Sequence, residues 1–478
     1  MVCLSVLFSG QWIGRERFVF PLAILPAQLA EEPEQGFYLN KLFRNRLMWI
    51  CFAVPFLIWG WNGFNAYYPA LPRIKMSWAT YGWFQTQPWN NFHLHSINIF
   101  FSIIGISFLL TTEISFSIWA FFVLFRLSFV ALAALGIPNT QYFGDWDSKV
   151  GDFQGAGAYL VMGVFTFYVA RQHLASVWRT AWGSGTSPEF SKWGARAVIS
   201  GTVAGPIIMM GWFIVGGVQP LFAAAGSLFF LIVLLVLTRL VCEAGLMYLG
   251  NESNPSDIFT GLFTPKTLSP ATAAHFAVQR GVLMHDPREF LMPYLSNGLK
   301  LGSLADFRGG RLILAFVGAI LTGYVFGGIG VLGTSYKYGM ANMDYHASQG
   351  APSYFLPTAA NFTKAETAPE PARYRAVHIV AGALGSAALL LLRSRFVWWP
   401  LHPYGWLICT TYAAWMIWSS VFMGWLLKVL AMKLGGPRFY RLAVPGFLGL
   451  ILGESVIAGL WALISLILGR PGIAVLPT

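Results

Sequence analysis

Charged residues are scarce in this chain. They make up 10% of its 478 residues, whereas apolar residues make up 56%. A soluble globule needs more polar surface than this to face water, so lipid must be the solvent for much of the protein. The apolar residues occur in runs of about 18 to 25, the length at which a helix crosses a hydrocarbon core of about 30 Å. The composition therefore predicts an all-α fold, a polytopic bundle of transmembrane helices in a bacterial-type inner membrane.

Common catalytic motifs are also missing. The chain has no P-loop, no Gly-x-Ser-x-Gly and no His-Glu-x-x-His, so ATP hydrolysis and the common hydrolase mechanisms have no support. His93 and His95 could chelate a metal on an extended segment, but no third ligand lies nearby in the sequence. The cysteines lie far apart without metal-site spacing, as is typical of small buried apolar residues. We expect no metal and no cofactor. The cysteines are Cys3, Cys51, Cys242 and Cys409.

Positive charge exceeds negative charge, with 31 Lys and Arg and a formal net charge of +12. A nucleic-acid-binding protein would gather these residues in a stripe or groove. Here they mostly flank the apolar runs, which is the pattern of topology signals and of contact with anionic lipid. The expected partner is therefore the lipid bilayer, and no nucleic acid is expected.

The apolar runs predict about ten crossings of the membrane, with a possibility of re-entrant or broken helices between them. Their boundaries are predicted to within a few residues. The predicted spans are 47–66, 95–111, 114–136, 156–171, 197–217, 220–240, 310–333, 377–393, 404–428 and 443–468.

The orientation of the first spans follows from the placement of Lys and Arg. The tail before the first span carries five of them, whereas the loop 67–94 carries only Arg73 and Lys75. Because basic residues concentrate in cytoplasmic loops, the amino terminus and the loop 172–196 are predicted to be cytoplasmic. The loops 67–94 and 137–155 are then external. The five basic residues of the tail are Arg15, Arg17, Lys41, Arg44 and Arg46.

The last two spans conflict with this rule. Counting ten spans places the connection 429–442 outside, yet it contains Lys433, Arg438 and Arg441. Either one crossing is missing from the count, or one segment enters and leaves on the same side. The connection 256–305 and the stretch 398–405 are the places to look, because Pro and Gly interrupt helices there.

The spans divide the chain into four predicted parts. Residues 1–46 form a cytoplasmic amino-terminal segment, and its apolar stub of about nine residues is too short to cross a bilayer. We therefore expect a further membrane segment upstream, lost from this chain or encoded separately. The other parts are a first bundle at 47–240, a cytoplasmic connection at 241–309, and a second bundle at 310–478 with an external loop at 334–376.

The first candidate site lies at the end of a long apolar run. Arg239 and Glu243 are four residues apart, so a helix places both charges on one face, where they can pair. Asn251 and Asn254 follow among glycines, in a stretch that can break the helix and expose polar backbone, as transporters do at ion and substrate sites. The alternative is that both charges lie at headgroup level and only fix the helix's position.

Two further charges lie within apolar runs. Glu454 has nearly three apolar turns on each side, so it must be protonated, paired or facing an aqueous cavity, and a proton-coupling role would suit it. Alternatively, it caps a neighbouring helix. Arg126 has no acid in its own run, so its partner must come from elsewhere; a structural tie and a clamp for a substrate anion are both open.

Glycines recur along several runs, including 318, 323 and 327, and 446, 449 and 453. Small residues at helical spacing let two helix backbones approach closely. Tight packing of the bundle is the first interpretation of these faces. Sliding of helices during transport is the second.

Several segments stand out from the apolar background. They are QWIGRERFVFPLAILP (11–26), TRLVCEAGL (238–246), RSRFVWWPLHPYGW (393–406), LGGPRFYR (434–441) and LGLILGE (448–454). In these, and over nearly its whole length, the chain resembles a family of large prokaryotic polytopic membrane proteins of unknown function. The resemblance implies the fold and additional amino-terminal spans, but no activity. A likeness to oligopeptide-transporter-type proteins rests on analogy alone. Val241-Cys242 departs from the Arg-Ala that precedes the Glu in that family.

The favoured hypothesis is a secondary-transporter-like permease for a small solute, with Arg239, Glu243 and the 245–255 break at a central polar site and Glu454 or Arg126 facing it. A membrane scaffold or assembly subunit is the first alternative. A membrane-embedded enzyme acting on a lipid-linked substrate is the second, and an enzyme is the less favoured class.

Overall fold

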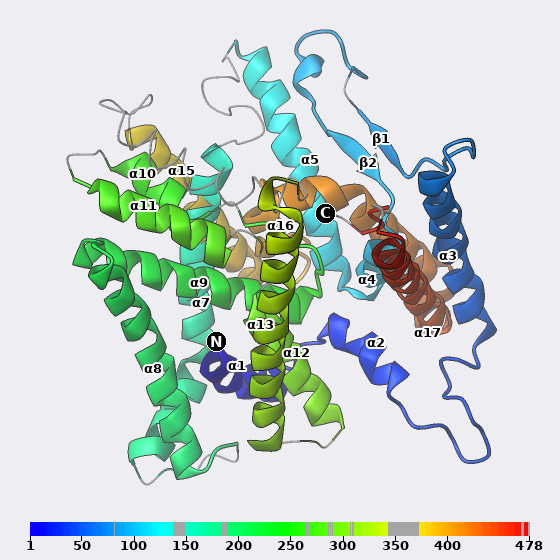
Figure 1. The fold of residues 1–478 in the computed structure, drawn as a ribbon. Coiled ribbons are helices and arrows are strands. Elements are labelled where there is room, and N and C mark those ends of the chain that lie inside the picture. The colour runs from blue at the N-terminus through cyan, green and yellow to red at the C-terminus, as the bar shows by residue number, and fades with distance from the viewer. Residues whose placement is uncertain are drawn as a thin grey trace. The chain divides into compact units, whose positions relative to one another are not determined.

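The chain forms the predicted all-α membrane fold. A computed structural model describes residues 1–80, 82–136, 149–183, 185, 189–251, 253–263, 267–284, 286, 288, 290–305, 307, 310–342, 372–469 and 473–476. In these ranges, eight helices are long and apolar enough to cross a membrane (Figure 1). They are α3 (Arg46–Tyr67), α5 (Thr112–Ala134), α7 (Lys149–Trp182), α8 (Lys192–Val215), α9 (Pro220–Ala244), α13 (Gly310–Tyr338), α15 (Ala372–Arg395) and α17 (Tyr412–Leu468).

Shorter elements connect these helices. Two strands, β1 (Ser77–Ala79) and β2 (Ser96–Asn98), pair antiparallel. A π-helical turn, Gly10–Arg15, follows the first helix. The short helices are α1 (Val2–Ser9), α2 (Pro21–Leu29), α4 (Phe101–Leu109), α10 (Pro255–Leu262), α11 (Pro270–Gln279), α12 (Leu291–Leu304) and α16 (Pro403–Ile408).

The contacts divide the chain into two compact units, and each draws on three stretches of sequence. Unit 1 contains residues 1–19, 149–242 and 251–384, and unit 2 contains 20–148, 243–250 and 385–478. Most of the predicted external loop, 343–371, lies outside the described residues. The four consecutive parts predicted from the sequence, with boundaries at 46, 240 and 309, were drawn from hydropathy. That division remains a prediction.

Unit 1 is built around α7, α8 and α9. The amino-terminal helix α1 packs against α8 and α12. The buried His173 of α7 holds α1 through a contact of 2.8 Å between Nε2 and the Leu7 carbonyl oxygen. The pair α10 and α11 begins at two side-chain caps, Asn254 and Ser269, each followed by a proline in the first turn. These are strong helix-start signals, because the caps satisfy free backbone amides and proline has none to satisfy.

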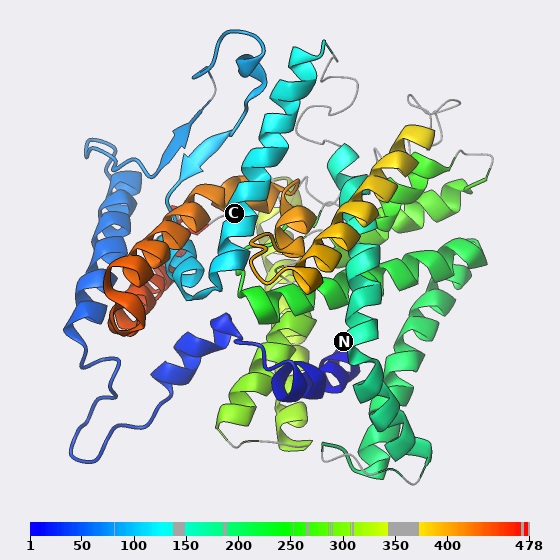
Figure 2. The same cartoon turned by 180° about the vertical axis from the view of Figure 1, so that it is seen from behind.

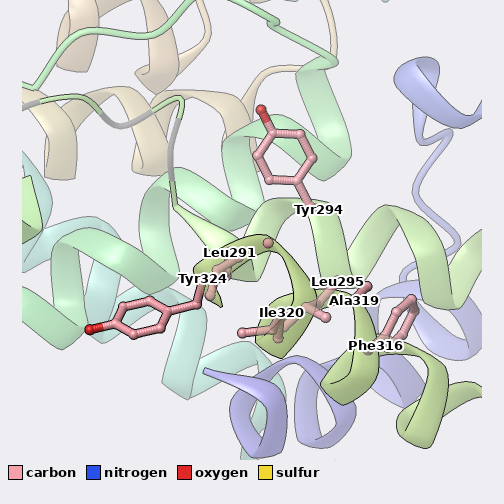
Figure 3. A pocket seen from close by; sticks show the side chains of 8 residues that line it. Leu291, Tyr294, Leu295, Phe316, Ala319, Ile320 and Tyr324 are labelled. Atoms are coloured by element: carbon pink, nitrogen blue, oxygen red, sulfur yellow. The ribbon is translucent and has the colours of Figure 1, made fainter. Parts of the chain in front are cut away.

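An apolar groove separates α12 and α13 in unit 1 (Figure 3). Its volume is about 690 Å³. Leu291 and Leu295 of α12 line it together with Phe316 and Ile320 of α13, and none of its lining residues is charged. Along α13 the glycines of the predicted packing face, among them Gly323, have no described atom within 4 Å of an added Cβ. This helix presents an apolar surface suited to lipid.

Unit 2 is organised by α17, which packs against α3, α4 and α5. In both views α4 lies against α17 (Figures 1 and 2). The second part of α17 approaches α3 closely, because a Cβ added to Gly449 or Gly453 would collide with the carbonyl oxygen of Met48 or Phe52. These contacts also fix direction. Residues 48 and 52 face 449 and 453 in the same order, so the two helices run parallel.

The predicted span 404–428 begins in α16, and its residues 412–428 join the predicted span 443–468 in one helix, α17, with a break at Gly436. This glycine has φ 64°, a left-handed conformation that side chains disfavour. Because α3 runs parallel to the part of α17 that follows the break, the beginning of α3 and the break lie at the same end of unit 2. The connection 429–442 therefore lies beside Arg44 and Arg46, which accounts for its basic residues.

The stretch 396–411 begins at that same end of unit 2. Arg393, just before it, forms an ion pair with Glu113 in the first turn of α5. Farther along α5, the Ser117 hydroxyl accepts a hydrogen bond of 2.6 Å from the His402 amide, and the rings of Phe121 and Trp406 are 5.9 Å apart. The chain thus runs along α5 away from its beginning.

The first part of α17 then runs back along the same helix. The rings of Trp418 and Phe122 are 5.7 Å apart, and those of Trp425 and Phe116 are 5.5 Å apart, so α17 descends toward the beginning of α5. The stretch 396–411 and the first part of α17 therefore run in opposite directions along α5. This hairpin contains 398–405, one of the two places indicated by Pro and Gly, and both explanations of the topology conflict stay predictions.

Candidate functional site

The predicted span 95–111 is a helix only in its second half. Residues 96–100 are extended, and α4 supplies nine helical residues. At about 3.3 Å per extended residue and about 1.5 Å per helical residue, the segment still covers roughly 30 Å, the thickness of a hydrocarbon core. The run 95–111 is apolar enough to cross a membrane. Hydropathy alone, however, does not distinguish a helix from a buried extended chain. We call residues 96–109 the interrupted segment.

Two serines of α17 satisfy the backbone of the extended half. The Asn98 amide donates to the Ser419 hydroxyl and the Phe100 amide to the Ser420 hydroxyl, both at 2.9 Å. Both hydroxyls donate in turn to the Asn98 carbonyl oxygen, at 2.7 and 2.8 Å. Non-helical backbone at membrane depth is stable only where protein or water supplies such partners. The adjacent serines in α17 are therefore part of the interrupted segment's support.

Glu454 lies at the beginning of α4. Its side chain is fully buried, and its carboxylate accepts hydrogen bonds from the Phe101 amide at 3.2 Å and the Ser102 amide at 2.6 Å. The indole nitrogen of Trp59 donates to the same carboxylate at 2.9 Å. These are the free amides of a helix N-terminus, where the helix dipole favours negative charge. Glu454 thus caps α4, as one of the two interpretations of the sequence expected. The partners of its carboxylate come from α3 and α4.

Lys428 lies at the opposite end of α4. Its buried ammonium donates to the carbonyl oxygen of Leu110, the residue that ends this helix, and lies 5.0 Å from the ring of Tyr440. A cation is favoured there by the same dipole. In the sequence, Lys428 looks like part of the basic stretch that ends at Arg441. Its position two turns inside an apolar run could have singled it out, because a lysine there needs a polar partner.

Arg126 lies on α5 among aromatic rings. Its guanidinium is 5.2 Å from the ring of Phe122 and 5.7 Å from those of Phe125 and Phe129. Cation–π contacts of this kind stabilise a positive charge away from water. Its charge also acts on His95 in the loop before the interrupted segment. Burial lowers the pKa of His95 from 6.5 to about 4, with the charges of Arg126 and His93 adding to the effect.

Arg239 forms its ion pair with a residue that the sequence analysis did not identify. In unit 1 its guanidinium binds the carboxylate of Glu16, with 3.3 Å between Nη1 and Oε1, and both side chains are largely buried. Gln11 donates to the same carboxylate at 3.0 Å, and the ring of Phe18 lies 5.0 Å from the guanidinium. The motif segment 11–26 thus carries the acid that neutralises Arg239. A sequence separation of more than 200 residues concealed this pair.

Glu243 belongs to a second cluster, in unit 2. The hydroxyl of the buried Tyr404 donates to its carboxylate at 2.6 Å, and His402 Nε2 lies 3.8 Å from Oε1. His402 caps α16, because its Nδ1 accepts from the Tyr404 amide at 3.2 Å. The motifs at 238–246 and 393–406 therefore meet at this carboxylate. The sequence identified Glu243 but not Tyr404.

Asn251 and Asn254 lie after the end of α9, where no helix is found among the described residues of 245–254. Asn254 caps α10 by accepting from the Asp257 amide at 3.1 Å, and Asp257 forms an ion pair with Arg280. Asn251 is buried and donates to the Ser253 carbonyl oxygen at 3.0 Å. The predicted break is present. Its two asparagines organise the local backbone of unit 1.

Within the described part of the chain, no group of three or more His, Cys, Asp or Glu is arranged to hold a metal ion. The candidate site of unit 2 consists of the interrupted segment with Glu454 and Lys428, and of the carboxylate cluster at Glu243. The pair of Glu16 and Arg239 is a separate cluster of unit 1.

Comparison with known families gives one match over residues 1–477, to a model described as a family of unknown function (DUF6785). No curated protein matches the chain. The match covers nearly the whole sequence and agrees with the resemblance in its motifs.

Proposed function

We propose that this protein, which belongs to the DUF6785 family of unknown function, is a secondary-transporter-like permease for a small solute. The interrupted segment carries this proposal. Transporters of several folds place their substrate and ion sites at discontinuous spans, where helix ends and extended backbone provide polar groups inside the membrane. Residues 96–109 have this construction, with a buried carboxylate at the break.

The charges held within unit 2 favour transport over a purely structural role. A buried ion costs several kcal/mol unless it is paired or hydrated, so it is retained where it serves a function. Glu454 and Lys428 both bind backbone at the ends of α4, a nine-residue helix that is too short to cross a bilayer alone. In addition, Glu243 with Tyr404 and His402 forms a chain of groups that can exchange protons or bind a polar solute. In the proposal these groups contribute to the solute and ion pathway.

The basic end of unit 2 supports a place in the inner membrane with this end in the cytoplasm. Seven exposed basic residues lie near the beginning of α3, the end of α15 and the break in α17. Cytoplasmic ends of membrane proteins carry such an excess, and anionic lipid attracts it. The residues are Arg44, Arg46, Arg393, Arg395, Lys433, Arg438 and Arg441.

Uptake into proteoliposomes tests the permease proposal. Purified protein is reconstituted and offered a panel of amino acids, di- and tripeptides, sugars and organic acids under an imposed proton gradient, and the contents are measured by mass spectrometry. We expect accumulation of at least one compound above protein-free liposomes. If the wild-type protein accumulates none of the panel, the permease proposal is wrong and the scaffold alternative replaces it.

The double variant Ser419→Ala, Ser420→Ala tests the role of the interrupted segment in that uptake. It removes the partners of the Asn98 and Phe100 amides, and we expect uptake to fall. The matched control is Ser128→Ala, because this hydroxyl donates to Phe125 within its own helix and should leave uptake unchanged. Equal uptake by the double variant and the control would remove the interrupted segment from the mechanism.

A further inference from the structure

We propose that Glu454 is the site at which the permease binds its coupling proton, an inference that rests on the proposed function and names its driving ion. The carboxylate is fully buried at the break of the interrupted segment. Three N–H groups donate to it, those of Trp59, Phe101 and Ser102, and the Ser102 hydroxyl also contacts the carboxylate. The observed arrangement is therefore that of the ionised acid, because a carboxylate accepts and does not donate.

A second group at the same place suits the protonated acid. The hydroxyl of Ser102 is fully buried beside the carboxylate, and it can donate to the ionised acid or accept from the protonated one. When a proton from water binds a Glu454 oxygen, the new O–H can donate to this hydroxyl oxygen. The carboxyl then changes from a charge of −1 to neutral, and one of its oxygens becomes a donor. The hydronium ion that delivers the proton loses one O–H bond and becomes water.

Proton binding would loosen the beginning of α4. The amides of Phe101 and Ser102 lose a charged acceptor, and the helix dipole loses the negative charge that stabilises its N-terminus. The amide–carboxylate contacts join α4 to α17, so their weakening allows the interrupted segment to move relative to α17. A proton at Glu454 thus changes the conformation of the segment that carries the proposed pathway.

The charged and titratable groups around Glu454 are few. In α3, α4 and α17, all of whose residues are described, Glu454 is the one acidic residue. Facing it, α3 contributes Trp59 and α4 contributes the Phe101 and Ser102 amides. The charged residues of α17, Lys428 included, lie toward its break, with Lys428 at the far end of α4. The proton has no competing carboxylate on these helices.

Infrared difference spectroscopy of the full chain in lipid nanodiscs tests this site with protons as the only ligand. Spectra recorded at acidic and alkaline pH should contain a carboxylic-acid carbonyl band that is shifted in Glu454→Asp and absent in Glu454→Gln. The matched control is Glu113→Gln, which removes an exposed acid paired with Arg393 and should keep the band. The same band in wild type and Glu454→Gln would overturn the proposal. If Glu454→Gln does not fold, an unshifted band in Glu454→Asp overturns it instead.

Transport measurements separate this proposal from the proposed function. With a solute taken from the uptake panel, Glu454→Gln should lose accumulation driven by a proton gradient but retain exchange of labelled for unlabelled solute, because glutamine imitates the neutral acid. Gradient-driven accumulation at the wild-type level in Glu454→Gln would contradict proton coupling here while leaving the permease intact. A titrating band without any solute uptake would contradict the permease and leave only a proton-binding site.

Discussion

Lys428 and Glu454 cap opposite ends of the same short helix. Both belong to α17, on either side of the break at Gly436, and between them they hold α4 by its last carbonyl and its first amides. Nine helical residues measure about 14 Å, too short to cross a bilayer alone. The two charges match the dipole of α4, positive at its C-terminus and negative at its N-terminus. A helix that would otherwise end with free polar groups inside the membrane is thereby stabilised.

Replacing Lys428 by Met should destabilise the protein by about 1–3 kcal/mol, the cost of leaving the Leu110 carbonyl without its partner in a buried place. Met has a similar length and no charge, so packing changes little. Thermal unfolding in detergent measures the effect. Lys433→Met is the control, because Lys433 is an exposed lysine on the same helix, and its effect should stay within about 0.5 kcal/mol. Equal unfolding temperatures for the two variants would show that Lys428 does not support α4.

Removing Glu16 from its pair with Arg239 should be far more harmful than removing an exposed ion pair. Glu16→Ala leaves a buried guanidinium without its acid, at a cost of about 3–5 kcal/mol. Glu34→Ala breaks the exposed pair with Arg44 and should cost about 0–1 kcal/mol. Chemical denaturation compares the two. The prediction is wrong if both variants unfold at the same denaturant concentration.

The beginning of α3 and the break in α17 should be labelled from the same side of the membrane. Single cysteines at Arg44 and Lys433 are expected to react from the cytoplasm, and one at Ala70, past the far end of α3, from outside. All three positions are exposed. An impermeant maleimide applied to intact cells and to inverted vesicles, in a background lacking the partly exposed Cys3 and Cys51, measures this. Labelling of positions 44 and 433 from opposite sides would refute the parallel packing of α3 against the part of α17 that follows the break.

Stability should rise with pH between about 4 and 6.5 because of His95. Burial lowers the pKa of this imidazole in the fold to about 4, against 6.5 in the unfolded chain. In that window the unfolded chain binds a proton that the folded chain does not, so acid favours unfolding. His95→Asn, which tolerates the positive φ of 60° at this position, should flatten the profile. An unchanged pH dependence of the unfolding temperature in this variant would assign the effect to another group.

The sequence predicts the long helices well, because their length and hydropathy are local properties. The first predicted span, 47–66, is α3 at Arg46–Tyr67. The Asn45 side chain accepts from the Leu47 and Met48 amides and caps the helix where the apolar run begins. The run 95–111 shows the limit of this reasoning. Its residues are apolar enough for a span, and only the partners on α17 determine that half of it is extended.

Charged residues inside apolar runs are visible in one sequence, whereas the residues that they contact are not. Arg239, Glu243 and Glu454 were found in this way. Glu16, Tyr404 and Trp59 lie in polar or aromatic surroundings where nothing distinguishes them, and each is distant in sequence from the charge that it contacts. The spacing of four residues predicted that Arg239 and Glu243 could pair with each other. The partners in the structure, the Glu16 carboxylate for Arg239 and the Tyr404 hydroxyl for Glu243, depend on tertiary packing, which local spacing does not predict.

The central claim, that this protein transports a solute through a site containing the half-buried carboxylate of Glu243, is tested most directly by measuring uptake and abundance together for Glu243→Gln. Membrane vesicles from one culture provide both quantities, with the panel solute for uptake and quantitative blotting for abundance. The account predicts that uptake falls at least about tenfold while abundance stays near the wild-type level, because glutamine removes the charge and keeps the shape. Abundance that falls in step with uptake would contradict it and favour a structural role.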